Sequence, residues 1–273
     1  MINRIDHRFA ELKSAGRTGL IPFITAGDPL PEAVVPLMHA LVAGGADLIE
    51  LGMPFSDPMA DGPVIQHSSE RALARGVGLK QVLGWVAEFR LSDSSTPVVL
   101  MGYLNPLEIY GYERFASDAV SAGVDGALLV DCPLEESATI GVLRASGLRQ
   151  IFLAAPTTAD ARLAEVCARA EGFLYYVSFT GITGANRLDL NPVRARVDAI
   201  KSATRAPVAV GFGVRDAVSA VTIGEFADAV VIGSALVEQL ENCANVDELR
   251  HRAHSFLAPI RAALDAAVTA HAA

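Results

Sequence analysis

Short, almost continuously apolar runs alternate with longer helical patterns along all 273 residues of the chain. Strands that are apolar at every position are typical of parallel strands buried on both faces of a sheet. Eight strand-and-helix units within about 250 residues are what a (β/α)₈ barrel requires. The alternation therefore predicts such a barrel, with strands at Leu20–Thr25, Asp47–Leu51, Pro97–Met101, Gly126–Val130, Gln150–Ala154, Phe173–Val177, Pro207–Val210 and Ala227–Ile232.

The segments between these runs have the periodicity of amphipathic helices. An N-terminal segment, Arg4–Leu12, places three apolar residues on one helical face and is suited to closing the lower end of a barrel. The tail from Val246 to about Ala270 is helical and rich in alanine. No linker or low-complexity segment interrupts the pattern, so we expect one domain over residues 1–273, an α/β barrel with an extra helix at each end. The clearest helical segments are Glu32–Ala43, Leu79–Phe89, Tyr112–Ala122 and Asp160–Ala170.

Composition excludes several classes of function. A net charge of −9 and the absence of a Lys/Arg cluster argue against nucleic-acid binding, which needs a basic face. No apolar run is long enough to span a bilayer, and the N-terminus carries charges where a signal peptide is apolar. Three cysteines without a C-x-x-C spacing, Cys132, Cys167 and Cys243, indicate reduced thiols, so we expect a cytoplasmic protein without a membrane partner.

The segment from Leu48 to Pro63 brings three carboxylates to the end of one predicted strand. Glu50 ends the apolar run, and Asp57 and Asp61 follow in a loop broken by Gly and Pro. A charged group at the end of a buried strand costs several kcal/mol unless it is paired, neutralised or used. Glu50 could pair with a buried arginine and Asp61 could cap a helix starting near Pro63. Alternatively, both are catalytic groups.

Glycine motifs follow the last three predicted strands. Glycines let the backbone approach a ligand, and free N–H groups at a helix start attract an anion. A helical run begins directly after Ser234, whose hydroxyl adds a donor. Because barrel phosphate sites commonly occupy these final loops, the motifs predict a phosphate-ester site at Gly184, Gly211, Gly213, Gly233 and Ser234.

The available side chains limit the chemistry. Only three lysines occur, Lys13, Lys80 and Lys201, and all fall in helical segments, so a Schiff base at a strand end is not expected. The six histidines show no ligand spacing, so we expect no metal site. With neither an imine nor a metal, the substrate must supply its own electron sink.

The run E-L-G-M-P-F-S-D-P-M-A-D-G-P, which starts at Glu50, resembles the signature of the tryptophan synthase α subunit family. Further motifs of that family follow the same order and together cover roughly residues 5 to 245. They are P-F-I-T-A-G-D-P from Pro22, M-G-Y-L-N-P from Met101, G-I-T-G from Gly181, G-F-G-V from Gly211 and G-S-A from Gly233. The resemblance implies a lyase that cleaves indole-3-glycerol phosphate to indole and glyceraldehyde 3-phosphate.

The resemblance also assigns roles. It matches Glu50 to the acid/base residue and Asp61 to the group at the indole nitrogen. For this chemistry burial should raise the pKa of Glu50, while Asp61 should stay ionised in a wetter loop. Thr183 matches a loop-closure residue, but Phe179 stands where some members carry Arg, which alters a charged contact of that loop. The positions that match the indole pocket are Phe23, Met101, Tyr103, Leu128, Leu153, Tyr175 and Phe212.

A partner is implied as well. The resemblance places Pro54, Asp57, Asn105 and Pro133 at the contact with a tryptophan synthase β subunit, in an α2β2 assembly. Pyridoxal phosphate would belong to that β subunit, because this chain offers no suitable lysine and is expected to hold no cofactor. Two alternatives remain from the sequence: a stand-alone lyase of the same fold, and an idle regulatory module, which intact Glu50 and Asp61 argue against.

Overall fold

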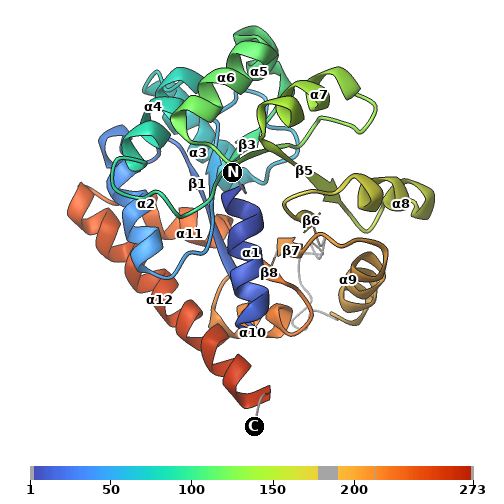
Figure 1. Ribbon diagram of the computed structural model, residues 1–273. Helices are drawn as coiled ribbons and strands as arrows, with labels where there is room; N and C mark the ends of the chain where they lie inside the picture. The colour runs from blue at the N-terminus through green and yellow to red at the C-terminus, as the bar shows by residue number, and fades with distance from the viewer. Residues whose placement is uncertain (1–2, 178–189, 212, 272–273) are drawn as a thin grey trace.

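Eight parallel strands close into a barrel in chain order, with β8 pairing back onto β1 (Figure 1). The computed structural model describes residues 3–177, 190–211 and 213–271. All eight predicted strands are present, so the predicted barrel is confirmed, although the second and last strands begin two residues later than expected. The strands are β1 (Gly19–Thr25), β2 (Ile49–Gly52), β3 (Val98–Gly102), β4 (Gly126–Leu129), β5 (Arg149–Ala154), β6 (Leu174–Val177), β7 (Val208–Gly211) and β8 (Ala229–Ile232).

Helices form the outer layer. The predicted helix from Glu32 is divided, because a 3₁₀ turn at Pro31–Ala33 precedes α2. Leu104–Tyr110, which the sequence pattern did not single out, forms the short helix α5 after β3. The helices are α1 (Arg4–Ser14), α2 (Val34–Ala43), α3 (Pro63–Ala74), α4 (Leu79–Phe89), α5, α6 (Tyr112–Ala122), α7 (Ser137–Ser146), α8 (Asp160–Arg169), α9 (Asn191–Ala203), α10 (Ala217–Gly224), α11 (Ser234–Leu240) and α12 (Val246–His271).

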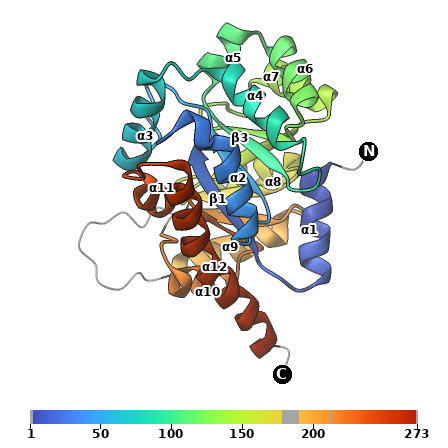
Figure 2. The same cartoon turned by 90° about the vertical axis from the view of Figure 1, so that its left-hand side faces the viewer.

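The helix α1 closes the amino-terminal end of the barrel, as predicted. Ile5, Phe9 and Leu12 are buried in one cluster with the inward-facing side chains of the strands, and the Phe9 and Phe173 ring centroids are 5.6 Å apart. Figure 2 shows α1 at one end of the barrel and α3 and α11 at the opposite end. The closed end leaves the carboxyl-terminal end of the strands for a ligand, as in other barrels.

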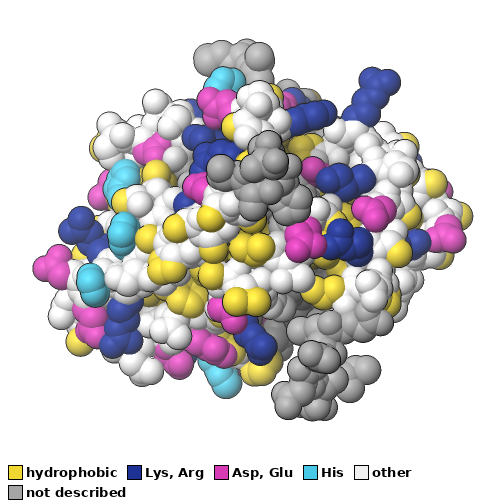
Figure 3. Space-filling model, turned by 90° about the horizontal axis from the view of Figure 1, so that it is seen from below, with side chains coloured by type: hydrophobic (Ala, Val, Ile, Leu, Met, Phe, Trp, Pro, Cys, Tyr) yellow, Lys and Arg dark blue, Asp and Glu magenta, His cyan; other side chains and the backbone are white. Residues whose placement is uncertain are grey.

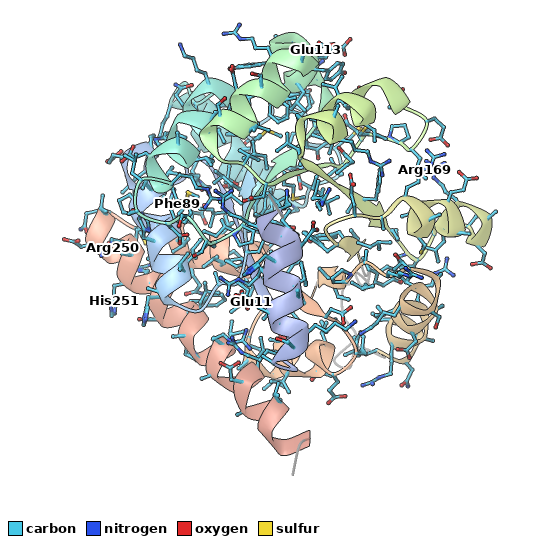
Figure 4. All side chains as sticks on the ribbon, viewed as in Figure 1. Glu11, Phe89, Glu113, Arg169, Arg250 and His251 are labelled. Atoms are coloured by element: carbon cyan, nitrogen blue, oxygen red, sulfur yellow. The ribbon has the colours of Figure 1, made fainter. Side chains whose placement is uncertain are left out.

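The outer helices bury their apolar faces against one another and the barrel. Phe89 points inward from α4 toward α2, where its ring lies 4.7 Å from that of His39 (Figure 4). On the face seen from below in Figure 3, Lys and Arg side chains are interspersed with Asp and Glu and form no broad basic area among the coloured residues. Within the described part of the chain, no helix combines the length and apolarity that a membrane crossing needs.

Candidate active site

Glu50 points into the barrel near the carboxyl end of β2. It pairs in register with Phe23 on β1 and Val99 on β3, and it shares the inward side of β2 with Leu48 of the interior cluster. Its exposed fraction is 0%, and neither carboxyl oxygen has a hydrogen-bond partner among the described residues. The buried-arginine alternative is therefore not realised. Burial raises the pKa of Glu50 from 4.5 to about 8, as the acid role requires.

Asp61 lies in the loop between β2 and α3, with its side chain turned toward β3. The Tyr103 hydroxyl donates a hydrogen bond of 2.9 Å to Asp61 Oδ2 and accepts one of 3.0 Å from the Ala60 N–H. The helix α3 has Gly62 as its N-cap without a side-chain hydrogen bond, so Asp61 does not cap it. Asp61 is partly buried rather than set in a wet loop, and burial raises its pKa, opposed by the Tyr103 hydrogen bond.

Asp61 and three of the predicted indole-pocket residues line one cavity. Phe23, Met101 and Tyr103 come from or directly follow β1 and β3. Sequence reasoning missed the other lining residues, among them Phe55, whose ring centroid is 5.1 Å from that of Tyr103. The signal for Phe55 was an apolar side chain within the carboxylate-bearing loop. The missed residues are Gly52, Met53, Phe55, Pro58, Ile65, Ser69, Gly102 and Val130.

Tyr175, on β6, is a further predicted pocket residue. It lies in the barrel interior with Leu128, and Leu153 packs against the same cluster. Burial raises the pKa of Tyr175 well above its ordinary value, and the charges of Glu50 and Asp61 raise it further. The pKa of Tyr175 therefore responds to the charges of both carboxyl groups. Phe212, the remaining predicted pocket residue, lies outside the described residues.

One of the three glycine motifs, at Gly233 and Ser234, adjoins this cavity. Gly233 directly precedes α11, whose start has no side-chain cap among the described residues, and Ser234 is exposed. A side chain at Gly233 would meet Phe23 first, with Cβ atoms 3.6 Å apart, so the start of α11 adjoins the apolar pocket. Gly213 follows β7 with φ +82° and is exposed. Thr183, Gly184 and Phe179 lie outside the described residues.

The predicted partner residues follow β2, β3 and β4 at the same end of the barrel. Asp57, Asn105 and Pro133 are exposed, whereas Pro54 is buried within the chain. Two large apolar side chains that sequence reasoning did not single out lie in the same segments, Met59 with 86% and Ile109 with 82% exposure. Within the described residues, no group of three His, Cys, Asp or Glu side chains could hold a metal ion.

Known proteins match the chain over nearly its whole length. The family model described as tryptophan synthase alpha chain matches residues 9–267. A tryptophan synthase alpha chain from Xylella fastidiosa is 60% identical over 266 residues, which cover 97% of this chain and 99% of that protein. One from Xanthomonas oryzae is 59% identical over 268 residues, which cover 97% and 100%.

Solved structures agree with these relatives. The tryptophan synthase subunit alpha of Legionella pneumophila superposes with a TM-score of 0.91 at 44% identity, covering 97% of this chain and 100% of that one. A chain of tryptophan synthase from M. tuberculosis gives a TM-score of 0.85 at 32% identity, covering 96% and 98%.

Proposed function

Since the chain belongs to the tryptophan synthase alpha chain family, it is a lyase that cleaves indole-3-glycerol phosphate, and we propose that Glu50 and Asp61 supply its acid/base groups. The main support for these roles is the state of Glu50. It is fully buried, it lacks a hydrogen-bond partner among the described residues, and its pKa of about 8 keeps it protonated at neutral pH.

Glu50 donates its proton to C3 of the indole ring, and Asp61 takes the proton from the indole nitrogen. The ring then carries a C=N bond that can accept electrons. Glu50, now ionised, removes the proton from the hydroxyl group of the adjacent side-chain carbon. The C–C bond breaks, its electrons restore the aromatic ring, and the hydroxyl-bearing carbon becomes the aldehyde of glyceraldehyde 3-phosphate. Asp61 returns its proton to the nitrogen, so both carboxyl groups recover their initial state.

The pocket orients the substrate for this exchange. Phe23, Met101 and Tyr103 are proposed to contact the ring, with Leu128, Leu153 and Tyr175 deeper in the barrel and Phe212 completing the set, and the cavity that the first three line, about 10 Å³, must widen for the ring to enter. The phosphate binds to backbone N–H groups at Gly184, Gly213, Gly233 and Ser234, and Thr183 keeps its proposed role in loop closure. A Cβ added at Gly233 would lie 3.6 Å from Phe23 Cβ, so the start of α11 adjoins the ring pocket, which supports a single substrate that spans both parts.

A β subunit that holds pyridoxal phosphate is the proposed partner, in an α2β2 assembly that receives the indole. Asp57, Asn105 and Pro133 would contact it, and Pro54 would shape the loop from within. The exposed side chains of Met59 and Ile109 support a docking surface here, because exposed apolar groups gain most from burial. The cytoplasm is the proposed location, consistent with three unpaired cysteines.

Turnover of indole-3-glycerol phosphate in a titration with β subunit tests this assignment. The loop that carries Asp61 is broken by prolines and glycine, so a partner that holds it should raise kcat. A misplacement of about 1 Å can cost ~10²-fold in rate, which is the scale of the activation expected. A fast rate without partner that does not change on addition would instead identify a stand-alone lyase.

A further inference from the structure

Arg71 on α3 joins three separate segments of the barrel's carboxyl-terminal end. Its Nε and Nη2 donate hydrogen bonds of 2.7 and 2.8 Å to the two carboxyl oxygens of Asp28, which follows β1 and is buried. Ser68, one turn earlier on α3, donates a further bond of 2.7 Å to Asp28 Oδ2. The remaining nitrogen, Nη1, donates a bond of 2.8 Å to Glu241 at the end of α11.

Two of these segments lead to the two parts of the proposed site, the catalytic carboxylate of Asp61 and the phosphate-binding start of α11. The helix α3 begins two residues after Asp61, so its position fixes one end of the loop that holds this carboxylate. The helix α11 begins at the proposed phosphate site and is about 10 Å long, given a rise of 1.5 Å per residue. Arg71 therefore contacts the far end of the phosphate helix, where a cation also complements the helix dipole.

The geometry uses the full guanidinium group. A two-pronged contact to Asp28 leaves one nitrogen free for Glu241, and a lysine ammonium cannot present donors in both directions from a fixed plane. We propose that Arg71 is a positioning residue that couples the loop of Asp61 to the phosphate helix α11, so that a bound phosphate helps to fix the catalytic carboxylate. This inference rests on the proposed phosphate site at Gly233 and Ser234.

The contacts of Arg71 to Asp28 and to Glu241 can be tested separately in the full chain, alone and with β subunit. Glu241→Gln removes the negative charge from the contact to α11 and leaves the contacts of Arg71 to Asp28 in place. It should raise the KM for indole-3-glycerol phosphate and the Kd for glycerol 3-phosphate about threefold, since one partner is half-exposed. It should also lower kcat, because the bound phosphate then acts less strongly on the Asp61 loop through Arg71. Ser68→Ala loosens α3 on Asp28 and should lower kcat about tenfold, part of the ~10²-fold that a 1 Å misplacement can cost.

Arg71→Gln should lower kcat and raise the KM for indole-3-glycerol phosphate. Arg71→Lys should not restore both values. In the Arg71→Gln background, Glu241→Gln should have no further effect on the Kd, because the contact is already lost. Glu238→Gln is the matched control, since it removes the same charge from an exposed position of α11 and should change nothing.

A merely structural role predicts a different result. If Arg71→Gln lowers the melting temperature but leaves kcat, KM and the Kd for glycerol 3-phosphate unchanged below that temperature, the coupling is refuted. If Arg71→Gln does not fold, identical behaviour of Glu241→Gln and Glu238→Gln refutes it. Gly233→Asp separates this outcome from a failure of the phosphate site itself. If Gly233→Asp loses binding of glycerol 3-phosphate while the Arg71 variants keep wild-type kcat, KM and Kd, only the coupling is refuted. If Gly233→Asp binds glycerol 3-phosphate normally, the phosphate site at Gly233 and Ser234 is refuted.

Discussion

The Tyr103 hydroxyl donates a 2.9 Å hydrogen bond to Asp61 and accepts a 3.0 Å bond from the neighbouring Ala60 N–H, so one side chain after β3 fixes two points of the loop after β2. This bond opposes the effect of burial on the Asp61 pKa, because it stabilises the ionised carboxylate. Tyr103 thereby holds Asp61 in position and favours its ionised form, against the rise of its pKa that burial causes.

Tyr103→Phe should lower kcat about tenfold, the effect of roughly 1.4 kcal/mol from one hydrogen bond to a charged group. Asp61 acts while ionised, so activity is lost as pH falls through its pKa. Without the Tyr103 hydroxyl that pKa rises, and the acid limb of the kcat profile should move to higher pH. Tyr110→Phe is a matched control, because it removes a 2.6 Å tyrosine–carboxylate bond to Asp118 on α6 and leaves Asp61 untouched. An acid limb that does not move would contradict this role of Tyr103.

Glu50→Gln should change the pH dependence of stability. The native pKa of about 8 lies above the ordinary 4.5, so the native state binds more protons than the unfolded state between these values. The free energy of unfolding of the wild type therefore falls as pH rises through this window, by about 3 kcal/mol at pH 7. The glutamine side chain of the Glu50→Gln variant cannot ionise, so the free energy of unfolding of this variant should not show this decrease.

Urea unfolding from pH 4 to pH 9 measures the difference. The stability of Glu50→Gln relative to wild type should increase between pH 4.5 and 8 and then level off. Glu113→Gln makes the same change on α6, where Figure 4 shows the side chain pointing away from the barrel, and should follow the wild-type curve. Parallel curves for wild type and Glu50→Gln would show that Glu50 is not neutral in the native protein.

Gly233→Asp should abolish binding of glycerol 3-phosphate while binding of free indole changes little, because the new carboxylate faces the phosphate at the start of α11. Gly233→Ala separates the effect of the added negative charge from the effect of the added side-chain volume. An added Cβ at this position makes only an ordinary contact, 3.6 Å from Phe23, so this variant should retain binding. Calorimetric titration with both ligands distinguishes the variants, and equal affinities of Gly233→Asp and wild type for the phosphate would place the anion elsewhere.

The strand ends were predictable from the sequence, whereas the loops around them were not. Glu50 ends an apolar run whose boundaries place it at the carboxyl end of a barrel strand, and Phe23 is assigned to the pocket by the family resemblance. Phe55, in the loop after β2, and Ser69, on α3, line the cavity because of the path of that loop and the position of that helix, and no local pattern encodes either. The Arg71 ion pairs join residues 43 and 170 positions apart, and a single sequence carries no signal for such pairs.

Single-turnover cleavage of indole-3-glycerol phosphate by Glu50→Gln tests the central claim most directly. Gln keeps the shape of the side chain but cannot donate a proton to C3 or accept one from the hydroxyl group. The rate should fall by at least ~10²-fold, the lower range for a general acid/base, while the affinity for glycerol 3-phosphate stays at the wild-type value. Cleavage at a near wild-type rate by the folded variant would show that Glu50 is not the proton donor.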